Sequence, residues 1–341
     1  MSITLKKSNQ LKSLAILMML FLHLFNRDYK GLFQPLLFIG SQPLSYYISL
    51  FCDACVPIFA FVSGYGLYLK YQQSHTECAK ANFLRLKKLY INYWIIIILF
   101  AVLLGWLTGA PGYPGSWWKF LENISGMNGS YNSAWWFFTS YVFFVLTSSF
   151  WFKLMEKFKP VIMLSLLFVL YIVSFWFRVY QNDIFEHNLL QYVHRQSALY
   201  FCTLFQFVLG AYALKMDWHG WMTTMFSRLR YPSVAAVLGI TALVVLHGLI
   251  PNFIIAPFTG LGFIFLFLQI KTGKLTDRAL DYFTPHATNL WLVHMFFYLI
   301  YFKEFIYSFT FVPLIFAVLV LVSLISSYMI NYIYHFVQKP S

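Results

Sequence analysis

The sequence predicts an all-α integral membrane protein, from its composition, its apolar spans and the distribution of its charges. Of the 341 residues, 60% are hydrophobic and only 10% are charged. A soluble domain carries roughly a quarter charged residues, so this composition cannot form an aqueous surface around one core. Aromatic residues make up 22% of the chain, as expected where side chains pack against lipid and line the membrane interfaces.

Ten segments are apolar enough to be membrane helices, each of which needs about 20 mostly apolar residues, with a range near 17–25. The predicted spans are residues 11–27, 44–69, 84–108, 133–153, 161–179, 196–215, 231–250, 252–270, 286–303 and 311–336. No internal repeat and no separate soluble domain is visible. We therefore expect one membrane domain over residues 1–341, with no fused soluble domain.

The basic residues set the expected orientation. With the N-terminus in the cytoplasm, 18 of the 24 Lys and Arg residues fall in cytoplasmic segments and the remaining 6 in outer ones. By the positive-inside rule, both termini are expected to be cytoplasmic. Because topology explains the net charge of +13, no nucleic-acid partner is expected.

The first span carries Lys12 near its start and His23 near its end. The segment has a basic start and a short apolar core, as a signal peptide does, but no small-x-small cleavage site follows it, so we expect it to be retained. Eleven residues correspond to about three helical turns, or about 16 Å, so both side chains lie on one face. Ionisable residues within spans usually face the bundle interior. The alternatives are a lysine that reaches the inner surface and a histidine buried in the core.

The cysteines and histidines indicate neither a metal site nor a disulfide framework. Cys52 and Cys55 form a Cys-x-x-Cys pair inside an apolar run, without a second pair, and are interpreted as small packing residues. The nine histidines show no convincing metal-ligand spacing, so no metal is expected.

Further motifs follow the Lys12–His23 pair in a fixed order. They are Phe59, Phe61, Ser63, Gly64 and Tyr65; Arg85 and Lys88; Trp136, Phe137 and Phe138; and Trp291, Leu292 and His294. The ordered set resembles acyltransferase family 3, the multi-pass membrane O-acyltransferases that modify cell-surface glycans. Lys12 and Lys88 stand where that family usually has arginine, so the charge is kept but the bidentate guanidinium fork is lost.

The resemblance implies transfer of an acyl group, most simply acetyl, from cytoplasmic acyl-CoA to a hydroxyl of a cell-surface or lipid-linked polysaccharide. His23 would be catalytic, either as a base or as a covalently acylated relay. Lys12, Arg85 and Lys88 would bind the donor phosphates. Acetyl-CoA would be a substrate rather than a tightly bound cofactor, and the protein would reside in the cell (inner) membrane.

Four residues are expected to support this site, each with a simpler alternative. Asp53 would orient an imidazole or line an outer vestibule, or else be solvated near the interface. Ser63 would line a pore, although a Ser-Gly break in an apolar helix is more often a close packing point. Trp136 would stack on a sugar or belong to an interfacial aromatic belt. His294 would partner His23 or the donor, or only bond another helix.

Two other functions fit parts of the same pattern. A multi-pass transporter or permease of a small solute or a lipid-linked sugar would also have polar span faces and helices broken by Gly and Pro. The absence of an inverted repeat disfavours the common transporter folds. A non-catalytic membrane scaffold would tolerate loss of both His23 and Arg85.

Overall fold

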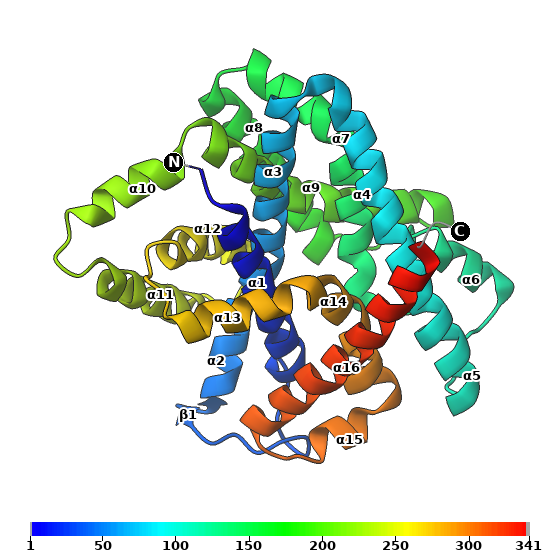
Figure 1. The fold of residues 1–341 in the computed structure, drawn as a ribbon. Coiled ribbons are helices and arrows are strands. Elements are labelled where there is room, and N and C mark those ends of the chain that lie inside the picture. Colours follow the sequence, from blue (N-terminus) through cyan, green and yellow to red (C-terminus); the bar gives the residue numbers. More distant parts are fainter. Residues whose placement is uncertain (1, 339–341) are drawn as a thin grey trace.

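The computed structural model describes residues 2–338 and is a bundle of helices with one two-stranded hairpin (Figure 1). In the first half of the chain the elements are α1 (Leu5–Phe25), β1 (Phe38–Ile39), β2 (Gln42–Pro43), α2 (Leu44–Phe51), α3 (Cys55–Gln73), α4 (His75–Ile96), α5 (Leu104–Thr108), α6 (Trp117–Ile124), α7 (Trp136–Lys157) and α8 (Pro160–Tyr180). In the second half they are α9 (Asn188–Lys215), α10 (Trp218–Ser227), α11 (Pro232–Leu249), α12 (Ala256–Phe267), α13 (Lys274–Phe283), α14 (Ala287–Met295), α15 (Lys303–Tyr307) and α16 (Val312–Gln338).

The all-α membrane fold expected from the sequence is confirmed. Within residues 2–338, eight helical segments are long and apolar enough to cross a membrane. The other two predicted spans form shorter or irregular helices: 252–270 contains α12, and 286–303 contains α14 followed by a π-helix at Phe296–Tyr301. The count of ten spans and the cytoplasmic position of both termini stay predictions.

The irregular turns of the long helices are not where the sequence places them. Helix α3 runs unbroken through Ser63 and Gly64, so the expected break there is wrong. The interruption lies earlier, where a 3-10 turn at Cys52–Ala54 joins α2 to α3. A second π-helix, Ile97–Leu103, interrupts the segment from α4 to α5. Its Phe100 ring stacks on Phe296 of the other π-helix, with ring centroids 5.3 Å apart.

Helices α3 and α9 form the tightest contact of the bundle, because glycines let their backbones meet. Figure 1 shows both near the centre, and α3 also contacts α1. A Cβ on Gly64 would lie 1.7 Å from the carbonyl oxygen of Phe207, and one on Gly210 would lie 2.0 Å from that of Phe61. Small residues at such positions allow close helix association in membranes. The packing interpretation of the Ser63–Gly64 pair is therefore confirmed for the glycine.

Segments expected on the same side of the membrane contact one another. Gln10 in the first turns of α1 donates hydrogen bonds to Asp277 and Asp281 of α13, at 3.2 and 2.9 Å. The Thr272 hydroxyl and the Lys7 ammonium lower the pKa of Asp277 to about 2. At the opposite end of α1, the Tyr307 hydroxyl donates to the carbonyl of Leu24 at 3.0 Å. This grouping agrees with the alternation that the charge distribution predicts.

Gly64→Ala is expected to destabilise the protein, because its methyl group would overlap the backbone of α9 and overpacking costs about 1–3 kcal/mol or more. Gly66→Ala is the matched control, since a Cβ on Gly66 meets nothing within 4 Å and alanine favours a helix. Thermal unfolding in detergent, followed by fluorescence-detected size exclusion, should show a lower midpoint for Gly64→Ala only. Equal midpoints in the two variants would contradict the close-packing account.

Candidate active site

Two imidazoles from opposite ends of the chain meet in the bundle. His23 lies in the last turn of α1, and His294 lies in the last turn of α14. The His23 Nδ1 atom is 2.7 Å from the His294 Nε2 atom, and the two ring planes are 6° from parallel. His294 is completely buried, whereas His23 is partly exposed. Of the partners considered for His294, His23 is therefore the one observed, and the contact is also a hydrogen bond between two helices.

The hydrogen bonds determine which nitrogen of each ring carries a proton. The His294 Nδ1 atom lies 3.0 Å from the carbonyl of Leu290 and 2.8 Å from that of Trp291. A carbonyl can only accept, so Nδ1 of His294 must donate, and its Nε2 atom accepts from Nδ1 of His23. His23 then keeps an unprotonated Nε2 atom, which is the nitrogen that can accept a proton from a substrate.

His23 lines a cavity of about 190 Å³, here called the His23 cavity. Its polar lining residues are His23, Asp53, Cys55, Tyr171, Arg178, Cys202, Thr203 and Gln206. The Arg178 guanidinium lies between two aromatic rings, 4.5 Å from the centroid of Trp136 and 4.8 Å from that of Phe253. The buried Oε1 atom of Gln206 has no hydrogen-bond partner within residues 2–338. This cavity therefore offers an aromatic wall, a cation and a free amide oxygen together with the imidazole.

A second cavity, of about 350 Å³, is here called the basic cavity. Its polar lining residues are Lys12, Ser63, Arg85, Lys88, Asn92, Tyr141, Thr288, Asn289, Asn331 and Tyr334. Arg85 is oriented by Asn82, which accepts from its guanidinium at 3.2 Å and itself donates to Ser148 and to the carbonyl of Val145. Three cations around one cavity form a site suited to an anionic ligand.

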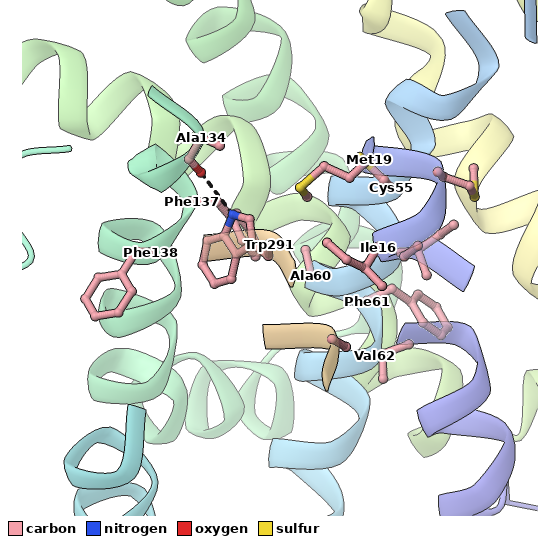
Figure 2. Packing of buried hydrophobic residues seen from close by; sticks show 14 of the residues in the cluster. Ile16, Met19, Cys55, Ala60, Phe61, Val62, Ala134, Phe137, Phe138 and Trp291 are labelled. Atoms are coloured by element: carbon pink, nitrogen blue, oxygen red, sulfur yellow. Dashed lines mark hydrogen bonds between the residues drawn. The ribbon is translucent and has the colours of Figure 1, made fainter. Parts of the chain in front are cut away.

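An aromatic partition separates the two cavities. Phe137 lines both of them, and Trp291 lines the basic cavity. The two rings pack edge to face with centroids 5.8 Å apart. Figure 2 shows the Trp291 indole directed at Ala134, whose carbonyl accepts its N–H at 3.0 Å. Helix α14 thus places Trp291 at the partition and His294 one turn further along, beside His23.

The chain was compared with protein-family models, with curated proteins and with solved structures. The family model Acyl_transf_3, described as an acyltransferase domain, matches residues 5–332. The chain belongs to acyltransferase family 3. No curated protein and no solved structure gives a significant match. Because this membrane family transfers acyl groups, the protein is an acyltransferase that requires an acyl donor and an acceptor.

The structure divides the residues predicted for this acyltransferase between the two cavities. Lys12, Ser63, Arg85 and Lys88 line the basic cavity, and Asp53 and Trp136 line the His23 cavity together with His23. The catalytic and donor-binding roles of these residues are not tested by the geometry and stay predictions. Within residues 2–338, no cluster of three or more His, Cys, Asp or Glu side chains could hold a metal ion.

Asp53 and Ser63 each line a cavity, which is one of the roles predicted for them. No hydrogen bond joins Asp53 to His23 in the described part of the chain; His294 orients that imidazole instead. Of the roles predicted for Asp53, the orienting contact is therefore not observed, whereas the residue does line the His23 cavity. The Ser63 hydroxyl donates to the carbonyl of Phe59 at 2.7 Å, one turn back in α3.

Several residues in these cavities are missing from the sequence-based site. Arg178 is one of the six basic residues that the charge distribution assigns to the outer side, and it lines the His23 cavity beside Trp136. Asn92, Asn289 and Asn331 line the basic cavity and carry no predicted role. Each is a single amide in an apolar span, and polar residues inside spans usually face the interior, so that signal was available. Only the fold shows that the three amides meet.

His294→Ala is expected to lower the rate of acyl transfer about 100-fold or more, because the His23 ring would lose the partner that fixes its tautomer. The apparent Michaelis constant for the donor should change little, since His294 lines neither cavity. His247→Ala is the matched control: this histidine is also fully buried, but its partner is Thr259 and it lines neither cavity. Steady-state assays in vesicles measure the transfer rate and the donor's Michaelis constant separately. Equal effects on the rate in both variants would contradict a positioning role for His294.

Proposed function

We propose that the protein is an O-acyltransferase of the cell (inner) membrane that moves an acyl group, most simply acetyl, from cytoplasmic acyl-CoA to a hydroxyl of a cell-surface or lipid-linked polysaccharide. The observation that carries the proposal is the position of the His23–His294 pair. His23 lines one cavity, and on the other side of the Phe137–Trp291 partition lies a cavity lined by three cations.

The basic cavity suits the donor. Coenzyme A carries a pyrophosphate and a 3′-phosphate at one end and the thioester at the other. Lys12, Arg85 and Lys88 line this cavity without a salt-bridge partner in the described part of the chain, so they are available to phosphate oxygens. The positive-inside rule places Arg85 and Lys88 at the cytoplasmic face, where acyl-CoA is made.

The His23 cavity suits the acceptor. Trp136 supplies an aromatic face of the kind that packs on sugar rings, and Thr203 and Gln206 supply hydrogen-bonding groups. A hydroxyl bound in this cavity lies next to the imidazole that can remove its proton. The pairing of an aromatic surface with a few polar groups is typical of small-molecule sites.

Direct transfer breaks the hydroxyl O–H bond and the thioester C–S bond, and forms a C–O bond and an S–H bond. The Nε2 atom of His23 takes the hydroxyl proton as the sugar oxygen forms a bond to the thioester carbonyl carbon. The tetrahedral intermediate then collapses, the carbon–sulfur bond breaks, and the thiolate takes the proton from His23. The hydrogen bond to His294 stabilises the imidazolium that forms in between, because Nδ1 of His23 continues to donate to it.

A covalent route uses the same residues in two steps. Nε2 of His23 attacks the thioester carbonyl carbon, and the carbon–sulfur bond breaks to release the thiolate. The sugar oxygen then forms a bond to the acyl carbon as the bond from that carbon to Nε2 breaks. The hydroxyl proton passes to the freed Nε2 atom and from there to the thiolate. The two routes differ in whether acyl-His23 accumulates when the acceptor is omitted. Rapid quenching with labelled acetyl-CoA, followed by mass spectrometry of the α1 peptide, separates them.

His23→Gln and His23→Ala are both expected to lower transfer about 10²–10⁴-fold, which is the usual contribution of a positioned base. Binding of labelled acetyl-CoA to the purified variants should be retained, because His23 does not line the basic cavity. The product is assayed by mass spectrometry of surface polysaccharide from cells that carry each variant. Wild-type acylation in both variants would remove His23 from the mechanism.

Arg85→Gln and Lys88→Ala are expected to raise the donor's apparent Michaelis constant about tenfold or more, since each loses a charge-assisted contact to phosphate. Lys87→Ala is the matched control, because Lys87 is exposed, lies in the same turn of α4 and does not line the cavity. High salt should weaken the wild-type donor interaction more than that of the two cavity variants. An equal rise in all three variants would assign the effect to surface charge in general.

A further inference from the structure

Three asparagines from three different helices form a continuous amide chain along the basic cavity. The Nδ2 atom of Asn92 in α4 donates to Oδ1 of Asn289 in α14 at 2.5 Å. The Nδ2 atom of Asn289 donates to Oδ1 of Asn331 in α16 at 2.9 Å and to the Ser327 hydroxyl at 2.9 Å. Asn289 is buried, while Asn92 and Asn331 are partly exposed, and all three line the cavity.

The direction of the amide chain is fixed by a group that cannot donate. The Nδ2 atom of Asn289 also approaches the backbone carbonyl of Ser327, at 3.4 Å. A carbonyl only accepts, so this end of the Asn289 side chain must be the NH₂ group, and its Oδ1 must accept from Asn92. The Ser327 hydroxyl is held in turn by Nδ1 of His286 at 2.8 Å. The three amides therefore run head to tail in a single order.

The two ends of the chain are left without protein partners. Within residues 2–338, Oδ1 of Asn92 accepts no hydrogen bond and Nδ2 of Asn331 donates none. One free end is thus an acceptor and the other is a donor. Both free ends belong to residues that line the basic cavity, so they are available to a ligand with one donor and one acceptor.

We propose that the Asn92–Asn289–Asn331 chain is the binding site for the amide groups of the donor's pantetheine arm. This inference rests on the proposed function. Pantetheine contains two secondary amides, each with one N–H and one carbonyl, which matches a free acceptor and a free donor on one wall. It also joins the phosphates to the thioester. The asparagines share their cavity with Lys12, Arg85 and Lys88 on one hand and with Trp291 and Phe137 on the other.

Two sets of residues in the basic cavity would then bind different parts of the donor. The cations bind the phosphates, and the amide chain binds the pantetheine arm. The two contributions to donor affinity can therefore be separated with truncated donors. A donor without phosphates but with both amides should keep the part of the affinity that depends on Asn92 and Asn331. A simple alkyl thioester should keep neither part.

The test compares four acetyl donors: acetyl-CoA, S-acetylpantetheine, S-acetyl-N-acetylcysteamine and ethyl thioacetate, which carry two, two, one and no amides. The variants are Asn92→Leu and Asn331→Leu, with Asn188→Leu as a control at an exposed position of α9 outside the cavity. In the wild type and the control, kcat/KM should fall at each loss of an amide. In each cavity variant the ratio between S-acetylpantetheine and ethyl thioacetate should shrink about three- to tenfold.

Each result decides between distinct explanations. The ratio between acetyl-CoA and S-acetylpantetheine should be unchanged in both asparagine variants, and Asn331→Gln should restore part of the lost amide dependence. An equal loss with all four donors, in folded protein as judged by size exclusion, would overturn the inference and leave the proposed function standing. A wild-type protein that uses no acyl thioester would instead overturn the proposed function, and the inference with it.

Discussion

A hydrogen bond between two imidazoles, those of His23 and His294, organises the candidate active site of this acyltransferase. Its direction is imposed from outside the pair, because the carbonyls of Leu290 and Trp291 force His294 to donate from Nδ1. His23 is thereby left with a basic Nε2 atom beside a cavity. An uncharged partner can orient the ring without placing a second charge in the bundle, where an isolated charge is costly. The position of α14 against α1 is therefore the constraint on which the chemistry depends.

Helix α14 connects the His23–His294 pair to the rest of the bundle. Trp291 stands at the partition between the two cavities, Asn289 lies in the amide chain, and His294 orients His23. The carbonyl of Leu292 accepts from Asn132 and from the Trp135 indole, which tie α14 to the start of α7. The π-helix that follows at Phe296–Tyr301 is a kind of irregularity often found at functional sites. A shift of α14 would disturb both cavities at once.

Local sequence signals predict much of this arrangement correctly, and their failures have physical causes. The spacing of Lys12 and His23 places both on the interior face of α1, as observed. By contrast, Ser63–Gly64 was expected to interrupt α3, yet the helix is regular there. The glycine is required by the backbone of α9, which lies more than 140 residues away along the chain. A local pattern cannot distinguish a glycine that allows a helix to bend from one that allows a neighbouring helix to approach closely.

The sequence by itself determined the membrane class, the family, the order of the apolar segments and the choice of His23 and His294 as candidate site residues. Apolar length and motif order are properties of the chain. Only the tertiary structure decided that Phe137 and Trp291 divide the interior into two cavities, that Asp53 lines one without bonding His23, and that Asn92, Asn289 and Asn331 form one amide chain. These features join helices distant in sequence. Their existence depends on how the helices pack, which no single span encodes.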